Sequence, residues 1–478
     1  MSPIDSSALE LLRKALSSNS SVNLPGDPEY TNKRWARNAE KTAAIVACPV
    51  TAEDVAQIIA FSQGNAPYDA QPKLDLAVKG GGHTPSGASS SEGGLVIDLN
   101  PKMHNVRVDP EGKLAYVQGG ALWANVDEAT FPHGLASVSG VVSHTGVGLI
   151  LGGGFGWLCS QYGLVIDNLV QATVVTSSGQ ILTASDSENP DLFWAIRGGG
   201  ANFGVVTEFV LKLHEQRSEL WGGMLIYPPT ILDKLVPEVN SWLAERTLVE
   251  NIHLVFMSGP SGPGVGLQIV YNGDAHTGAQ KFERFVKLEP IMAKLGPIPY
   301  LRLNRMQDPF AEHGLYRMLQ GNFMPSVPTG LPLEVVNGFF ASWLKMVTEN
   351  PVASASVIMW ELYHPGAFSS VPKDATAYGN RAPTYNIGYF MNWSDPAWTE
   401  QSIPTVLALD KEFMKLRDAH FPPDLVGEGG YINYQDAESQ KGGVSRRFAS
   451  HFPRLVEIKR KYDPENLFGK WFAIPTQV

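Results

Sequence analysis

Cysteine is nearly absent from this chain of 478 residues, which contains only two, Cys48 and Cys159. Two cysteines cannot form a disulfide framework, and they cannot supply the paired Cys-x-x-Cys ligands of a structural zinc site. We therefore expect no metal site. Cys159 is expected to be a small buried side chain, which is the usual place of a free cysteine in a folded core.

Long apolar runs are also missing. No stretch reaches the roughly 18 consecutive apolar residues that a membrane-spanning helix requires, so no membrane partner is expected. Residues 1–23 carry Asp5, Glu10, Arg13 and Lys14 among their leucines and lack the apolar core of a secretory signal. We therefore expect an intracellular protein, with secretion as the alternative.

An excess of positive charge is the third absence. The formal net charge is -10, from 37 basic and 47 acidic side chains, and the sequence has no lysine- and arginine-rich run. Such a chain is not attracted unspecifically to nucleic acid or anionic lipid, so neither is expected as a partner. Its length predicts two or three subdomains, and 44% of its residues are hydrophobic, which is enough to enclose a cofactor.

Glycine, by contrast, is abundant and concentrated. Of the 47 glycines, Gly80, Gly81 and Gly82 follow the apolar stretch 76–78 and directly precede His83. Successive glycines let the backbone turn tightly and present N–H groups to an anion such as a diphosphate. A glycine run alone is more often a flexible turn, and a histidine alone is more often structural.

Two more glycine clusters lie in the same half of the chain, at 145–156 and 197–204. Together the clusters indicate one backbone surface that approaches one large ligand closely. A nicotinamide-binding Rossmann unit is the main rival, and it requires the spacing G-x-G-x-x-G after a strand. Here Gly146 and Gly148 are followed by glycine only at Gly152, one position late, and the regular alternation of strands and helices is missing. We therefore disfavour a Rossmann fold.

Hydrophobic periodicity predicts an α+β chain. Thr51, with Asp54 three residues later, predicts a capped amphipathic helix that continues to residue 63. A basic amphipathic helix with solvated charges is predicted at 448–467, where Asp463 precedes Pro464. Other predicted strands are 76–78, 95–99, 106–108, 114–118, 172–176, 181–183, 254–258 and 357–363, and other predicted helices are 277–294 and 333–349.

The most specific pattern is the order of short segments at 79–83, 152–158, 162–164, 167–168, 189–204, 431–436 and 461–468. In this order they resemble the FAD-linked oxidases of the vanillyl alcohol oxidase and p-cresol methylhydroxylase (PCMH) superfamily, in the branch similar to berberine bridge enzyme. The resemblance implies a two-part FAD-binding domain of PCMH type, residues 1–212 and 416–478. It encloses an inserted α+β substrate domain, residues 213–415, expected to be an antiparallel sheet backed by helices.

The resemblance implies FAD as the cofactor, bonded covalently to the imidazole of His83. Many relatives carry a second link from a cysteine, but the corresponding stretch 141–145 reads Val-Val-Ser-His-Thr, so this link is not expected. The other residues implied at the flavin are Lys79, Gly80, Gly81, Gly82, Thr84, Ser86, Gly119, Thr145, Gly146, Gly148, Gly152, Gly153, Gly154, Phe155, Gly156, Val206, Asn433 and Tyr434.

The implied activity is an oxidase or dehydrogenase that takes a hydride from a small-molecule alcohol, sugar or natural-product intermediate. O2 or another acceptor would reoxidise the flavin. Hydride transfer needs a base for the O–H or N–H proton, and Tyr431 or Tyr434 is expected to serve. Relatives place Gln or Glu where Gly388 stands. Glu361 could replace it from a neighbouring strand, although an exposed structural glutamate is the ordinary interpretation. A nicotinamide-dependent dehydrogenase and a flavin-binding protein without catalysis are the alternatives.

Overall fold

Helix α2 (Ala52–Gln63) shows how the first layer of the computed structural model is built. The N-cap Thr51 hydroxyl accepts from the Asp54 N–H at 3.1 Å, and the Asp54 carboxylate accepts from the Thr51 N–H at 3.1 Å, as the sequence predicts. The apolar side of the helix, including Val55 and Ile58, is buried against a four-stranded sheet. The structure describes residues 4–260, 262–435 and 443–477.

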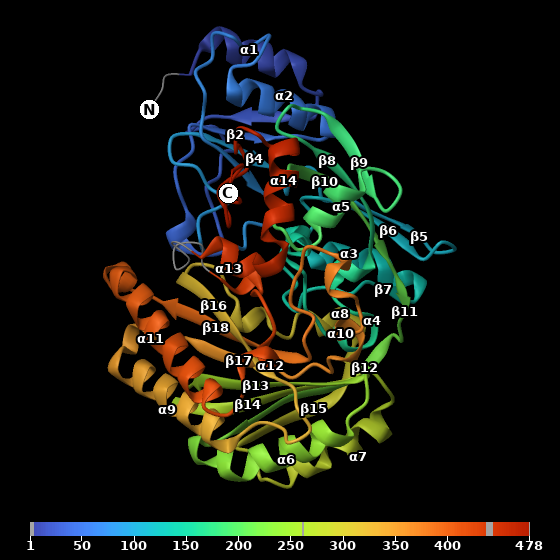
Figure 1. Cartoon of the computed structure of the whole chain (residues 1–478), viewed down its shortest axis with the longest axis vertical. Coiled ribbons are helices and arrows are strands. Elements are labelled where there is room, and N and C mark those ends of the chain that lie inside the picture. Colours follow the sequence, from blue (N-terminus) through green and yellow to red (C-terminus); the bar gives the residue numbers. More distant parts are fainter. Residues whose placement is uncertain (1–3, 261, 436–442, 478) are drawn as a thin grey trace.

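Two larger sheets and the antiparallel pair of β7 and β11 form the N-terminal half, shown in blue to green in Figure 1. The first has the order β1-β2-β4-β3, with β2 and β3 parallel to β4, and the second is antiparallel in the order β5-β6-β10-β8-β9. Each strand predicted in this half is present. The elements are α1 (Ser6–Ala15), β1 (Ser21–Asn23), β2 (Ile45–Cys48), β3 (Leu76–Lys79), β4 (Leu95–Asp98), β5 (Val106–Asp109), β6 (Leu114–Gln118), α3 (Trp123–Thr130), β7 (Leu135–Ala136), α4 (Cys159–Tyr162), β8 (Leu169–Val175), β9 (Ile181–Ser185), α5 (Pro190–Ile196), β10 (Val205–Lys212) and β11 (His214–Glu215).

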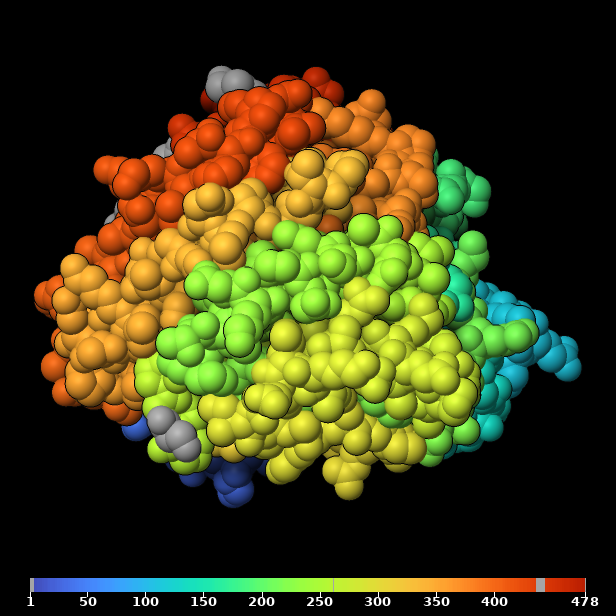
Figure 2. Space-filling view, turned by 90° about the horizontal axis from the view of Figure 1, so that it is seen from below, coloured from blue at the N-terminus to red at the C-terminus, as the bar shows by residue number. Residues whose placement is uncertain are grey.

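A seven-stranded antiparallel sheet follows, in the order β15-β12-β14-β13-β17-β18-β16. Helices α6, α9 and α11 cover its outer face, toward the bottom of Figure 1, and the green and orange segments of Figure 2 show this covered side. The predicted antiparallel sheet backed by helices is thus confirmed. The elements are β12 (Glu219–Tyr227), α6 (Leu232–Glu245), β13 (Glu250–Gly259), β14 (Gly262–Tyr271), α7 (Ala275–Val286), β15 (Met292–Pro299), α8 (Tyr300–Leu303), β16 (Tyr316–Pro325), α9 (Leu333–Glu349), β17 (Val357–Glu361), α10 (Gly366–Ser369), β18 (Thr384–Trp393) and α11 (Thr399–Asp418).

Strand β17 shows how the two faces of this sheet differ. Side chains alternate between the faces of a strand. Ile358 and Trp360 pack into the core under the helices, whereas Val357 and Met359 belong to a separate apolar cluster on the inner face. Glu361, two positions beyond Met359, lies on the same inner side. Because both faces are covered, the strand is apolar up to this glutamate and its alternation is hidden in the sequence.

The helix predicted at 277–294 is wrong in its second half. Helix α7 ends at Val286, and the chain continues into strand β15 from Met292. Between them Glu289 has a positive φ of 57°, directly before Pro290, and a proline disfavours helical geometry at the residue before it. The apolar residues after this break therefore extend the sheet instead of the helix.

The C-terminal helix α14 (Phe452–Tyr462) is shorter than predicted and its charges are not all solvated. It packs on α5 in the N-terminal half, as the red helix in the upper part of Figure 1 shows. It follows Ala449, which has a positive φ of 45°, and is capped by Asp463. The Lys459 ammonium is fully buried and donates to the Asp463 carboxylate at 2.6 Å, so this basic residue is a core ion pair.

The remaining short helices are α12 (Pro423–Val426) and α13 (Val444–Phe448). Among the described residues, no helix is both long enough and apolar enough to span a bilayer.

Candidate active site

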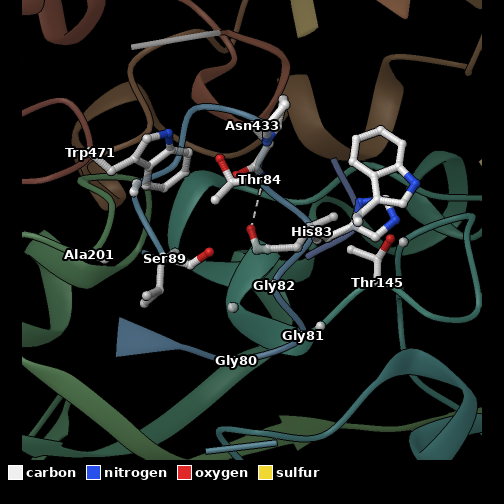
Figure 3. Close-up of a pocket in the computed structure, with 18 of the residues that line it drawn as sticks. Gly80, Gly81, Gly82, His83, Thr84, Ser89, Thr145, Ala201, Asn433 and Trp471 are labelled. Atoms are coloured by element: carbon white, nitrogen blue, oxygen red, sulfur yellow. Dashed lines mark hydrogen bonds between the residues drawn. The ribbon is translucent and has the colours of Figure 1, made fainter. Parts of the chain in front are cut away.

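A large cavity lies between the N-terminal sheets, the C-terminal segment and the inner face of the seven-stranded sheet. Figure 3 shows its glycine-rich wall at Gly80, Gly81 and Gly82, with Thr145 on one side and Asn433 and Trp471 from the C-terminal segment on another. Three parts of the chain that are distant in sequence therefore build one site. Of the residues predicted at the flavin, those that line it are Gly80, Gly81, Gly82, His83, Thr84, Gly119, Thr145, Gly146, Gly148, Phe155, Val206, Asn433 and Tyr434.

The glycine loop after β3 permits contact between two backbones. A Cβ on Gly81 would lie 2.6 Å from the Gly146 nitrogen, and a Cβ on Gly146 would lie 2.4 Å from the Gly81 nitrogen. Gly82 has a φ of 69°, a conformation that other residues adopt rarely. The two loops can therefore meet only without side chains, and they leave a smooth backbone wall on the cavity.

Lys79 does not line the cavity, contrary to the prediction. Strands β3 and β4 are parallel and pair Lys79 with Asp98. The Lys79 ammonium donates to both oxygens of the Asp98 carboxylate, at 2.9 and 3.0 Å, and both side chains are buried. The lysine is thus neutralised behind the loop, where it anchors the end of β3 instead of binding an anion.

The glycines between 152 and 156, which were predicted at the flavin, also lie behind the cavity wall and do not line it. A Cβ on Gly152 would lie 2.3 Å from the Asn433 side-chain oxygen, and a Cβ on Gly156 would lie 1.7 Å from the Ser139 carbonyl oxygen. Gly152 thus allows close packing against Asn433, which lines the cavity, and Gly156 allows close packing against Ser139, which does not. Gly153, Gly154 and Ser86 are likewise absent from the lining.

His83 borders the cavity in a stack of planar groups. Its imidazole lies 4.0 Å from the Trp35 ring at an interplanar angle of 12°, and the Arg317 guanidinium carbon lies 4.2 Å from the centroid of the Trp35 ring. The His83 Nε2 is buried and has no hydrogen-bond partner among the described residues. Burial, with His144, His313 and Arg317 nearby, lowers the pKa of His83 well below its ordinary value. The imidazole is therefore neutral and keeps a nitrogen lone pair for bonding.

No cysteine reaches this cavity in the described part of the chain. In the stretch where relatives carry the second link, the Ser143 hydroxyl donates to Asp308 at 2.6 Å and Thr145 lines the cavity. Cys159 is fully buried on α4, as predicted, and burial raises the pKa of its thiol. Neither thiol is placed to bond a ligand in the cavity.

Tyr434 and Glu361 form a hydrogen-bonded pair beside the cavity. The Tyr434 hydroxyl donates to the Glu361 carboxylate at 2.8 Å, and the Asn386 side-chain amide donates to the other oxygen at 2.6 Å. Tyr434 lines the cavity and Glu361 lies behind it, 1% exposed. Burial raises the pKa of Glu361 to about 7. The interpretation of Glu361 as an exposed structural residue is wrong, because the inner face of β17 carries it beneath the C-terminal segment.

Tyr431 makes different contacts from Tyr434, the other tyrosine that was predicted as the alternative base. Its hydroxyl accepts from the Phe155 backbone N–H at 3.3 Å and from the Asn433 amide at 3.1 Å. Burial raises the pKa of Tyr431, and its hydrogen bonds join it to neutral N–H donors. Tyr431 therefore holds the loop at Phe155, whereas Tyr434 has a carboxylate to receive its proton.

Gly388 explains why Tyr434 fits against the sheet. Gly388 on β18 pairs with Gly321 on β16. A Cβ on Gly388 would lie 2.9 Å from Tyr434 Cε2, and a Cβ on Gly321 would lie 2.9 Å from Tyr434 Cβ. The two glycines form a shallow saddle that receives the tyrosine. The missing Gln or Glu at Gly388 thus makes room for the pair formed by Tyr434 and Glu361.

Several lining residues were not predicted from the sequence. Trp35 precedes every glycine motif, and Gln307 lies in a loop of the inserted domain far from them. Trp471 lies three residues beyond the segment 461–468, so only a wider search around that segment could indicate it. Ser89 and Ala201 are labelled in Figure 3; Ser89 follows the first glycine loop, and Ala201 lies within the cluster at 197–204. Their positions depend on tertiary packing instead of local sequence.

The cavity fits FAD on two observations. The imidazole of His83 is neutral and has an unpaired buried nitrogen, and the adjoining wall is backbone from which side chains are excluded. In the described ranges 4–260, 262–435 and 443–477, no group of three or more His, Cys, Asp or Glu is arranged to hold a metal ion. The site combines a place for a large planar cofactor with a tyrosine and carboxylate pair that can accept a proton.

Family models match two of the three parts of the chain that build the cavity, the N-terminal part and the C-terminal segment. The model for an FAD binding domain matches residues 43–185, and the model described as berberine and berberine like matches residues 430–475. The FAD-linked oxidoreductase pgmH of Aspergillus terreus is 33% identical over 463 residues, which cover 92% of this chain and 90% of that protein. The similarity therefore extends over nearly the whole length of both chains.

Solved structures show the same fold. 6-Hydroxy-D-nicotine oxidase from Arthrobacter nicotinovorans is 24% identical with a TM-score of 0.82, covering 96% of this chain and 99% of its own. Xylooligosaccharide oxidase from Myceliophthora thermophila is 23% identical with a TM-score of 0.80, covering 98% of this chain and all, 100%, of its own. These proteins thus share both the N-terminal half and the part that contains the seven-stranded sheet.

Proposed function

The chain belongs to the berberine-bridge-enzyme-like FAD-linked oxidoreductases, and from this we propose that it oxidises a small alcohol or amine with FAD held covalently by His83. The single observation that carries the proposal is the pair formed by Tyr434 and Glu361 at the cavity, since it supplies a proton acceptor where the cofactor site meets the inner face of the sheet. When bound, FAD supplies the hydride acceptor.

The protein's part in holding FAD falls to the stack around His83. A neutral imidazole can bond an electron-poor carbon, whereas a protonated one has no free lone pair. Trp35 holds the ring by stacking, and the Arg317 guanidinium nearby disfavours its protonation. We propose a single covalent link, because Cys48 and Cys159 are both buried and neither lines the cavity.

The protein's part in the chemistry is to remove a proton. The Tyr434 oxygen takes the proton from the substrate O–H or N–H while its own proton is transferred to the Glu361 carboxylate, within the hydrogen bond whose oxygens lie 2.8 Å apart. Asn386 donates to the second carboxylate oxygen and keeps the group oriented. The carbon next to that oxygen or nitrogen then loses its hydride, so the substrate loses two electrons and two hydrogens in total. We propose O2 as the final acceptor, because both solved structures described above are named oxidases.

Flavin reduction should depend on pH through Glu361. Its pKa is raised to about 7 by burial, and only the ionised carboxylate can receive the proton. The rate of anaerobic flavin bleaching should therefore fall about tenfold per pH unit below 7 and level off above it. Stopped-flow traces between pH 5 and 9 measure this, and in Glu361→Gln the inflection should disappear. An inflection that persists in that variant assigns the titration to another group.

An absorption spectrum before and after acid precipitation tests the proposed function first. A yellow pellet, with a flavin-sized mass on the peptide that contains His83, would support the covalent link. A colourless pellet under a yellow supernatant would support FAD as the cofactor but contradict the covalent link. A flavin that no alcohol or amine bleaches anaerobically would contradict the proposed reaction.

A further inference from the structure

The far end of the cavity, against the seven-stranded sheet, is lined almost entirely by apolar side chains. We infer that the substrate is an apolar ring compound with one hydroxyl or amino group, and not a sugar; this rests on the proposed function. The residues of this end, called here the sheet end, are Gln307, Phe310, Ala311, Leu319, Val357, Met359 and Phe390.

Leu319, Val357, Met359 and Phe390 are strand residues whose side chains point to the inner face, and Gln307, Phe310 and Ala311 come from the segment before β16. Val357 and Met359 form one cluster with Val255 and Met257 of β13, and Phe310 and Phe390 pack against it. Leu319 belongs to the adjoining cluster around Trp35, which Phe390 also contacts. The apolar surface is therefore continuous from the stack at His83 to the middle of the sheet.

Charge is absent from the sheet end. Among the described residues that line the cavity, Lys470 is the one with a formal charge when His83 is neutral, and it pairs with Asp75 at 2.5 Å. Lys470 adjoins Phe468 and Trp471 in the C-terminal segment, away from the sheet. Glu361 is reached only through Tyr434, because it lies behind the lining.

Gln307 is the single polar side chain of the sheet end, and its amide nitrogen is already engaged. The Gln307 Nε2 lies 3.1 Å from Nδ1 of His253 and also donates to the Gln268 side-chain oxygen. His253 in turn contacts the Tyr363 hydroxyl at 2.9 Å. The Gln307 nitrogen is thus committed to contacts inside the sheet, and this side chain offers a ligand at most its oxygen.

A sugar suits this surface poorly. It carries a hydroxyl on nearly every carbon, and each one buried without a partner weakens binding about fivefold or more. An aromatic or fused-ring substrate loses nothing in this way and packs against Phe310, Phe390 and the Met359 thioether. Its one polar group would then meet the Tyr434 hydroxyl, which lies where the sheet end adjoins the rest of the cavity.

The test measures binding and oxidation separately on the flavin-loaded protein. 1-Naphthalenemethanol and benzylamine represent ring compounds, and xylobiose and glucose represent sugars. Perturbation of the flavin absorption spectrum gives Kd, and anaerobic bleaching gives the reduction rate. We expect the ring compounds to bind about tenfold or more tighter than the sugars. Tighter binding of a sugar, or no binding of either ring compound, would overturn the inference.

Variants locate the binding surface. Met359→Gln and Leu319→Gln should each raise the Kd for 1-naphthalenemethanol about tenfold, because an amide is introduced into the apolar end. Ile291→Gln makes the same kind of change at a side chain that is 67% exposed and outside the cavity, and should leave Kd unchanged. Unchanged Kd in both cavity variants would overturn the inference. The comparison of ring compounds with sugars in the unsubstituted protein stands even if a variant fails to fold.

The outcomes separate this inference from the proposed function. If a sugar bleaches the flavin and no ring compound does, the proposed oxidation is supported and the inference of an apolar ring substrate is wrong. Binding of ring compounds without bleaching by any alcohol or amine would keep the substrate class and contradict the proposed oxidation.

Discussion

His83→Ala should release the flavin from the polypeptide. Acid precipitation of the variant is expected to leave a colourless pellet and a yellow supernatant, because the only imidazole that borders the cavity is removed from the described wall. Activity should also fall, since loss of a covalent bond to the flavin loosens its binding and makes it a weaker oxidant. Visible absorption of pellet and supernatant, with the mass of the peptide around residue 83, measures both.

His144→Ala is the matched control for this experiment. His144 lies 5.1 Å from the His83 ring, centroid to centroid, but does not line the cavity. The control should keep the flavin in the pellet. Flavin that stays attached in His83→Ala, or leaves only in His144→Ala, would show that the assignment of the linking histidine is wrong.

Tyr434→Phe should slow flavin reduction by substrate roughly 10²–10⁴-fold while the flavin remains bound. The change removes the hydroxyl that borders the cavity and contacts Glu361 at 2.8 Å, but keeps the ring that fills the saddle at Gly388 and Gly321. Glu361→Gln should have an effect of similar size, because an amide cannot accept the tyrosine proton. Stopped-flow bleaching under anaerobic conditions gives the rates directly.

Tyr431→Phe provides the comparison for these variants. Its hydroxyl accepts from Phe155 and Asn433 and touches no carboxylate, so the rate of flavin reduction should change much less. A large loss in Tyr431→Phe with a normal rate in Tyr434→Phe would reverse the roles of the two tyrosines. Equal losses in both would indicate that loop position, and not proton transfer, limits the rate.

Most of the cavity wall expected to contact the cofactor could be predicted from local sequence. The glycine loop and His83 are contiguous, so one motif predicts a tight turn and the side chain beside it. Lys79 directly precedes this loop in the sequence and was predicted at the flavin for that reason, but it does not line the cavity. Its neighbour across the parallel strands is Asp98, and the pairing of β3 with β4 that brings them together is not visible in a glycine motif. A lysine next to a ligand loop is therefore not evidence of a ligand contact.

The proton-accepting pair shows what local sequence cannot predict. Tyr434 and Glu361 are 73 positions apart, and they meet only because the C-terminal segment crosses the inner face of the sheet. The burial of Glu361 follows from that crossing and not from β17 itself. The apolar sheet end was equally hidden, since Val357 and Met359 look the same in sequence as Ile358 and Trp360 on the helix-covered side.

The discontinuous wall of the cavity also sets an order of events during synthesis. Asn433 and Trp471 line the same cavity as the glycine loop, which is translated long before them. A ribosome-bound chain that already contains His83 and all its glycines still lacks this side of the site. Enclosure of the cofactor therefore requires the chain as far as Trp471, and a nascent chain stalled before residue 431 would hold His83 without an enclosed place for the flavin.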